Sequence, residues 1–215
     1  MISIQVNALY LKSLRHIMAV RDVRYYLNGV YFECDVRGKF YVACDGHRLG
    51  VYFEPWRDDE DVQTVNVIIP GEVIKAIKPH KSGFAAVLSC SERKQNDGVD
   101  VSAWKLDTRN GMALSFDGID GKYVDWQRVI PQTVSGDFSA VNFEYLADFN
   151  RCLRDGADQR YSAVIRHNGN GANVVMPASD GIPFVGVVMS MRAREDEYKR
   201  PQWLDFPPAE LRKTA

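Results

Sequence analysis

The sequence predicts an α+β fold made of repeated β-α-β-β-β units, with antiparallel sheets and with helices on one face. Two observations lead to this prediction. Strand-like segments and short amphipathic helices recur in one regular order, and the three segments that start the predicted helices align without a gap. At 215 residues, of which 46% are hydrophobic, the chain can bury a substantial core as one large domain or two small ones.

The first unit is predicted to contain a strand, a helix and two long strands. Its helix shows apolar residues at helical spacing, Leu11, Leu14 and Ile17 among them, and Arg37-Gly38 provides the turn between the long strands. A charged connector at 54–61, which contains a proline, follows the unit. The predicted elements cover residues 3–6, 9–20, 25–36 and 39–53.

The second and third units repeat the order. The second is predicted to hold a strand, a short helix and three strands, at residues 65–69, 71–78, 85–91, 101–106 and 112–116. The third is predicted to hold the same elements at residues 138–143, 144–154, 163–167, 172–176 and 184–191.

Three helix starts carry the evidence for a repeat. Residues 6–14, 69–77 and 141–149 align without a gap, and in each a β-type residue is followed by asparagine or proline. Asparagine caps a helix and proline forms the turn before one. Apolar residues then recur three apart on one helix face. The alternative is a chance similarity, because many junctions between a strand and a helix look like this.

Composition limits the class of protein. The net charge of −1 argues against a uniformly basic surface, but a protein can still concentrate lysine and arginine on one face. No apolar run approaches the roughly 20 residues of a membrane span, and the N-terminal residues lack the pattern of a signal peptide. We therefore expect a cytoplasmic protein without membrane contact, and reduced thiols at the four scattered cysteines Cys34, Cys44, Cys90 and Cys152.

The sequence also predicts that the chain is not an enzyme and needs no cofactor or metal. Residues 45–48, Asp-Gly-His-Arg, are the one stretch that suggests catalysis, and a tight feature of the strand in which Asp45 hydrogen-bonds backbone at Gly46 explains them better. The four histidines are too far apart for metal-ligand spacing. Phosphate-binding glycine loops and the nucleophile elbow are missing.

Four segments resemble the bacterial DNA sliding clamp, the beta subunit of DNA polymerase III. Residues 22–30 are similar to the opening of the clamp's middle domain, and residues 43–49, ACDGHRL, resemble the family's ATDGHRL. Residues 120–131, DGKYVDWQRVIP, resemble DGRFPDYRRVLP at the close of that domain. Residues 186–193, GVVMSMRA, resemble the family's C-terminal VVMPMRL, with Ser190 in place of proline.

This resemblance implies a DNA-clamp fold and a division of the chain. Residues 1–131 correspond to a complete middle clamp domain, residues 132–193 to the second half of the third domain, and residues 194–215 to a polar C-terminal tail. The half domain is expected to leave a helix and a sheet edge unpaired, which favours an oligomer.

The implied function is that of a processivity factor, which binds double-stranded DNA without sequence specificity and tethers DNA polymerase and clamp-loader subunits. Clamp helices line a ring around DNA, and the matching helices carry basic side chains opposite their apolar faces. The alternative is an ordinary solvated helix face. The candidate DNA-binding residues are Lys12, Arg15, Arg24, Tyr25, Tyr26, Lys75, Lys78, Arg151 and Arg154.

The resemblance also implies a groove that accepts a short peptide from those partners, in which methionines repack readily around different ligands. For each apolar residue the alternative is ordinary core. The candidate groove residues are Leu27, Cys44, Gly46, His47, Arg48, Leu49, Val124, Arg128, Val129, Val187, Val188, Met189, Met191 and Arg192. In the tail, residues 202–206, QWLDF, loosely resemble such a peptide.

The number of chains in a closed ring follows from the number of units in each chain. Clamp rings hold twelve units, so three units per chain would need four chains, a homotetrameric ring. A monomer or a dimer that never encircles DNA is the alternative. In that case the chain would be a clamp-derived interaction module that recruits or sequesters clamp-binding proteins.

Overall fold

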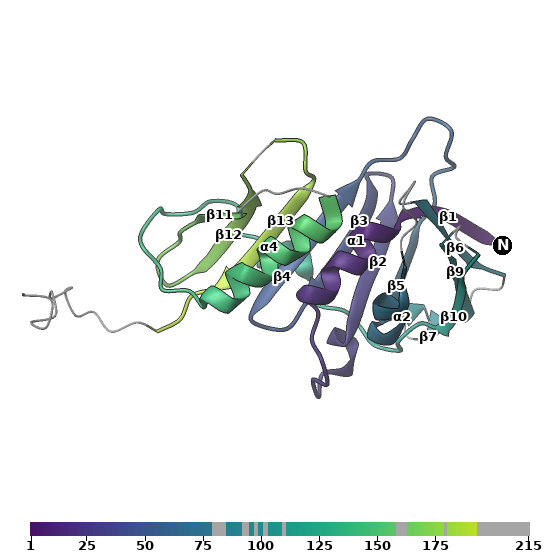
Figure 1. The fold of residues 1–215 in the computed structure, drawn as a ribbon, viewed down its shortest axis with the longest axis horizontal. Helices are drawn as coiled ribbons and strands as arrows, with labels where there is room; N and C mark the ends of the chain where they lie inside the picture. Colours follow the sequence, from purple (N-terminus) through teal and green to yellow (C-terminus); the bar gives the residue numbers. More distant parts are fainter. Residues whose placement is uncertain are drawn as a thin grey trace, which may run out of the picture.

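The computed structural model describes residues 1–78, 85–91, 95–96, 99–100, 103–108, 111–157, 163–178 and 180–192. Its antiparallel sheets and few helices confirm the predicted α+β class (Figure 1). Predicted residues in the tail, 202–206 among them, lie outside the described residues.

The first unit has one strand more than predicted. It consists of β1 (Ile2–Asn7), α1 (Ala8–Ser13) with a 3-10 turn at Leu14–His16, and then β2 (Gly29–Asp35), β3 (Gly38–Cys44) and β4 (Arg48–Glu54). The long strand expected at 39–53 was wrong, because a turn divides it. Asp45 Oδ1 accepts hydrogen bonds from the backbone N–H of His47 and of Arg48, both at 2.9 Å.

Two other boundaries of this unit differ from the prediction. The helix expected to reach residue 20 ends with the 3-10 turn at Leu14–His16. The strand expected from residue 25 begins only at Gly29, because Tyr25–Leu27 form another 3-10 turn.

The second unit follows the prediction closely. It consists of β5 (Val65–Pro70), α2 (Gly71–Ala76), β6 (Ala85–Cys90), β9 (Ala103–Asp107) and β10 (Ala113–Asp117). Two short strands, β7 (Gln95–Asn96) and β8 (Val99–Asp100), pair as a small ribbon between β6 and β9. A short helix, α3 (Trp126–Val129), comes after β10.

The third unit contains α4 (Phe143–Ala157), β11 (Ala163–Arg166), β12 (Ala172–Pro177) and β13 (Phe184–Met189). The strand expected at 138–143 was wrong. Residues 138–142 form no strand in the structure, because no strand among the described residues pairs with them.

The three helix starts fall at the aligned positions, which confirms that part of the repeat. The helices α1, α2 and α4 begin at Ala8, Gly71 and Phe143. Asn7 Oδ1 accepts from the N–H of Leu9 at 3.0 Å and of Tyr10 at 3.2 Å. Asn142 Oδ1 accepts from the N–H of Glu144 at 2.9 Å. Asparagine thus caps the first and third helices.

The first two units interlock by exchanging their first strands. β1 of the first unit pairs with β6 of the second, and β5 of the second unit pairs with β2 of the first. The four-stranded sheet therefore has the order β1-β6-β9-β10. Neither of these two units can complete its own sheet without the other.

The third unit joins the first through its last strand. β13 pairs antiparallel with β4, which places Val187 opposite Leu49 and makes a seven-stranded sheet of order β11-β12-β13-β4-β3-β2-β5. The helices α1, α2 and α4 lie on the same face of this sheet (Figure 1). We call them the helix layer.

The helix of the third unit is not wholly unpaired, which corrects the prediction. α4 packs beside α1, and its Asp155 Oδ2 lies 2.8 Å from both Arg15 Nη2 and His16 Nε2. Tyr52, on β4, donates a hydrogen bond to the carbonyl oxygen of Cys152 on α4 at 3.0 Å. The opposite side of the third unit, at β11, has no partner strand among the described residues, as predicted.

Candidate functional site

The two faces of the seven-stranded sheet carry different side chains. Toward the helix layer lies the main hydrophobic core, which includes Leu11, Leu14, Phe149 and Val188. On the other face lies a second cluster of buried residues, which we call the outer cluster; it contains Ala19, Leu27, Val42, Cys44, Leu49, Val51, Ile68, Tyr123, Trp126 and Val187. This alternation is what a sheet covered on both faces requires.

Basic side chains lie along the helix layer, and acidic groups neutralise several of them. Arg15 pairs with Asp155, Arg151 with Asp148, and Arg154 Nε lies 3.6 Å from Asp155. Lys75 is exposed on α2. Lys78, also exposed, lies just beyond the end of α2.

Lys12 connects the first two helical segments, because its Nζ donates to the carbonyl oxygen of Ile77. Burial, and then the charge of Arg15, lower the pKa of Lys12. Of the basic candidates on the helix layer, Lys75, Lys78, Arg151 and Arg154 are the exposed ones. Lys12 and Arg15 are therefore half-buried and held by other groups, whereas the side chains of Lys75, Lys78, Arg151 and Arg154 are more accessible.

Arg24, Tyr25 and Tyr26 lie in the 3-10 segment that precedes β2. Arg24 Nη2 lies 2.7 Å from Asp22 Oδ2 and donates to the carbonyl oxygen of Asp45 at 3.0 Å. The hydrogen bond from Arg24 holds the pKa of the half-buried Asp22 at about 2. Tyr25 is exposed and its ring contacts Tyr26 edge-on. The arginine thus joins this segment to the turn after β3.

The structure brings the apolar groove candidates together. Leu27, Cys44, Leu49 and Val187 are buried in the outer cluster, and Val124 and Val129 pack against it half-buried. They come from three separate stretches of the chain, as the resemblance to the clamp family implied. Ordinary core packing would gather the same residues.

The polar and long groove candidates lie around this cluster. Met189 is 45% exposed and Met191 51%, and the N–H of Met189 donates to the carbonyl oxygen of His47 at 2.9 Å. Arg128 is exposed beside Asp125. Exposed Gly46, His47 and Arg192 complete the set.

Two groove candidates point elsewhere. Val188 is fully buried in the core under the helix layer, on the opposite face of β13 from Val187, so it cannot line the same groove. Arg48 is also turned toward the helices. Its Nη1 lies 2.7 Å from Asp148 Oδ2 and its guanidinium stacks over the Tyr145 ring. Adjacent residues on a strand face opposite ways, which explains both corrections.

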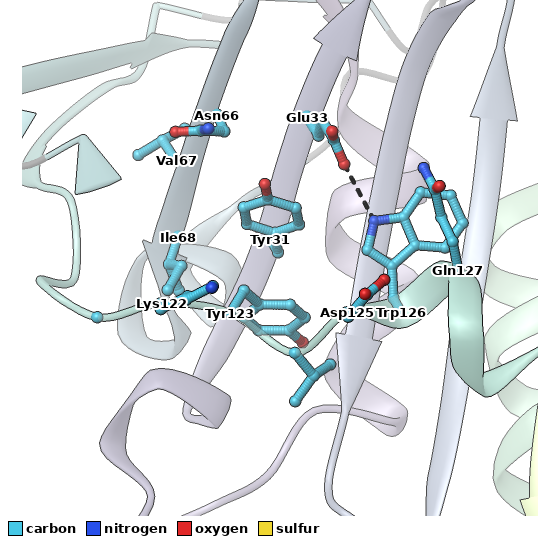
Figure 2. Close-up of a pocket in the computed structure, with 12 residues that line it drawn as sticks. Tyr31, Glu33, Asn66, Val67, Ile68, Lys122, Tyr123, Asp125, Trp126 and Gln127 are labelled. Carbon is cyan, nitrogen blue, oxygen red and sulfur yellow. Dashed lines mark hydrogen bonds between the residues drawn. The ribbon is translucent and has the colours of Figure 1, made fainter. Parts of the chain in front are cut away.

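Beside the outer cluster is a pocket of about 460 Å³, which sequence reasoning missed (Figure 2). The rings of Tyr31 and Tyr123 stack 4.8 Å apart in its wall, and Trp126 Nε1 donates to Glu33 Oε2 at 3.0 Å. The available signal was the alternation of Tyr31 and Glu33 along β2, both on the face away from the helices. Burial raises the pKa of Tyr31, which therefore remains a neutral phenol.

Histidine, cysteine and acidic side chains are dispersed over the described part of the chain. No group of three or more histidine, cysteine or acidic side chains there could hold a metal ion. The four cysteines are buried free thiols, and burial raises the pKa of Cys34 and of Cys152 to about 12. Across the same residues, no helix combines the length and the apolar character needed to cross a membrane.

Comparison with known proteins identifies similar chains. Residues 8–87 match the family described as DNA polymerase III beta subunit, central domain. The beta sliding clamp of Salmonella typhimurium is 28% identical over 126 residues, which cover 57% of this chain and 31% of that protein. The beta sliding clamp of Vibrio cholerae is 31% identical over 122 residues, which cover 55% and 30%. The chain thus spans about a third of the length of these curated relatives.

Solved structures extend the similarity to the fold. The DNA polymerase III subunit beta from Pseudomonas aeruginosa superposes with a TM-score of 0.66 at 19% identity, covering 90% of this chain and 67% of that one. The beta sliding clamp from C. crescentus gives 0.64 at 19%, covering 89% and 66%. The third unit, which lies outside the matched family segment, therefore belongs to the same fold.

Proposed function

This chain is a relative of the bacterial DNA sliding clamp, and we propose that it acts as a processivity factor that holds its partners on double-stranded DNA. Sliding clamps are not enzymes, and the predicted lack of catalysis is confirmed by this relationship. The proposed location is the cytoplasm. The proposed partners are duplex DNA, a DNA polymerase and clamp-loader subunits.

The observation that carries the DNA-binding part is the helix layer. Three helices from three units lie on one face of a continuous sheet (Figure 1). Each carries basic residues, and those on α2 and α4, Lys75, Arg151 and Arg154, are exposed. Such a surface can neutralise phosphates without reading base edges, which is what a sliding protein needs. The near-neutral net charge fits a protein that keeps its basic groups on one face.

We expect the double substitution Lys75→Ala and Arg154→Ala to weaken binding to a fluorescent duplex of random sequence. Each phosphate contact that is lost should lower the slope of log K against log salt by about 0.9, so the slope should fall by nearly 2. Fluorescence anisotropy at several salt concentrations measures it. Lys122→Ala, which removes an exposed lysine from the pocket on the opposite sheet face, is the matched control. An unchanged slope in the double variant would contradict the assignment.

The partly exposed surface beside the outer cluster, where Val124, Val129 and Met189 lie, is proposed to receive the partner peptide. A dry apolar surface with a rim of exposed methionines and polar groups suits a short segment that ends in leucine or phenylalanine. The two methionines on the rim can adapt to different partners. Val188 and Arg48 are left out of this proposal for the reasons given above.

Met189→Ala should weaken binding of a glutamine-containing peptide that ends in Leu-Phe by about fivefold, or about 1 kcal/mol, because it removes apolar contact area from the rim. Met176→Ala is the matched control. Met176 is 44% exposed against 45% for Met189, and it lies on β12 away from the outer cluster. Equal affinities of the two variants in a fluorescence-polarisation titration would remove Met189 from the groove.

A closed ring is proposed to need four copies, since each chain supplies three units. The two larger described sheets end in four outer strands. β1 and β5 belong to the strand exchange between the first two units, and β10 and β11 are the other two. Each copy would therefore contact two neighbours. The alternative, an interaction module that does not encircle DNA, has no observation in its favour.

A further inference from the structure

The third unit lacks what the first two units supply to each other. In the first domain, the first strand of each unit pairs with the first strand after the helix of the other unit, as β5 pairs with β2 and β1 with β6. β11 has the same place in the third unit as β2 and β6 have in theirs. Its outer side pairs with no strand among the described residues.

The segment before α4 already occupies the place of a first strand. In the second unit, the N–H of Ile119, two residues after β10, donates to the carbonyl oxygen of Ile68 at 3.0 Å. In the third unit, the N–H of Met191, two residues after β13, donates to the carbonyl oxygen of Ala140 at 2.8 Å. Ile68 and Ala140 hold equivalent positions, three residues before the start of α2 and of α4.

The two units therefore make the same contact, and only the pairing of the first strand differs. Since backbone groups alternate sides along an extended chain, a neighbour of Ala140 such as Val141 directs its N–H and C=O away from Met191. Ile68 sits in a paired strand because β2 lies on that other side. Among the described residues no strand pairs with residues 138–142. Within this segment the N–H of Ser139 donates to His167 Nδ1 at 3.3 Å, whereas the backbone groups of Val141 have no backbone partner among the described residues.

Apolar groups on this side of the third unit are also left uncovered. Phe143, at the start of α4, is 79% exposed, and Val164 on β11 is exposed. Val141 and Ile165 are only half-buried against the core under the helix layer. Unpaired strand edges next to exposed apolar side chains mark a surface that another chain covers.

We propose that a second copy of this chain covers it, through the same half domain, across a two-fold axis. Residues 138–142 of one copy pair antiparallel with the outer side of β11 in the other copy, and the reverse pairing forms at the same time. One two-fold operation satisfies both edges, because each copy offers one first strand and needs one. The two α4 helices would then lie together as α1 and α2 do in the first domain.

A second copy is favoured over a different protein because the required partner is defined by the first domain. It must offer a first strand that leads into a helix, and a free strand edge after that helix. The third unit has both. This inference rests on the proposed ring of four copies. It specifies one of the two interfaces between copies that such a ring would use.

The test is the mass in solution of two variants, measured by sedimentation equilibrium between 1 and 50 µM. Val141→Pro removes the backbone N–H that pairing would use, and Val164→Lys places a charge on the exposed edge. Val62→Pro and Val36→Lys make the same changes at exposed valines in a connector and a turn. Thermal melting of each variant shows that it is folded.

We expect the wild-type protein and both controls to have an even multiple of the 24.4 kDa chain mass, and both test variants to fall to half of that mass while still unfolding cooperatively on heating. A wild-type monomer at 50 µM, or folded test variants that keep the wild-type mass, would overturn the inference. Salt-dependent DNA binding is measured on the same samples. If DNA binding is normal while the mass does not change, only the inference fails; if wild-type oligomers ignore DNA, only the proposed function fails.

Discussion

Lys39→Ala should lower the free energy of unfolding by about 3–5 kcal/mol, because it leaves a buried carboxylate without its cation. Lys39 lies on β3 with no exposed surface, and its Nζ donates to both carboxylate oxygens of Glu60 at 2.8 Å. Glu54 lies 3.7 Å from the same nitrogen, and the Trp56 ring lies 5.0 Å away. The ion pair thus fastens the connector at 54–61 to the sheet.

Urea unfolding measures the effect, and two further variants test its cause. Arg57→Ala removes the more distant and 51% exposed cation of the same carboxylate, 3.5 Å from Glu60 Oε1, and should cost less than about 1 kcal/mol. The double substitution Lys39→Met with Glu60→Leu should recover much of the loss, since an apolar pair of similar size carries no desolvation penalty. If Lys39→Ala costs no more than Arg57→Ala, the buried pair is not what holds the connector.

Gly186→Ala should destabilise the protein by about 1–3 kcal/mol, through overpacking at the junction of the first and third units. Gly186 on β13 lies opposite Gly50 on β4, in the pairing that joins the two units. A Cβ atom at Gly186 would lie 2.5 Å from Cε1 of Phe149 on α4. The missing side chain lets the helix approach the sheet at this point.

The second substitution Phe149→Leu distinguishes this explanation from a general intolerance of the strand. Leucine removes the ring edge that the new methyl group would meet. The double variant should therefore lose less stability than the sum of the losses in the two single variants. Thermal unfolding of the four proteins gives the coupling energy. Strict additivity would show that the ring does not cause the loss.

The helix starts were predictable because their signals are local. Asn7 and Asn142 cap their helices with their own side chains, so the prediction needed only neighbouring residues. The turn within 39–53 was missed although Asp45 was expected to bond to nearby backbone. A strand pattern on both sides hid the break, because a turn of three residues interrupts alternation only briefly.

In the candidate site, the direction of individual side chains was not predictable from the sequence. The groove candidates were taken from three matching segments, and six of the fourteen lie in the outer cluster or pack against it. Val188 and Arg48 were misplaced because a matching segment does not show which way each side chain points. The pocket between Tyr31 and Trp126 was missed because its walls come from strands and a loop that are distant in sequence.

The sequence by itself determined the repeated unit, its helix caps and the clamp resemblance, because each depends on residues that are close together along the chain. Only the tertiary structure decided which strand pairs with which unit. Strand pairing is made by backbone groups that every residue carries, so its partners follow from how whole units pack. For that reason the exchange of β1 and β5 and the joining of β13 to β4 became visible only in the folded chain.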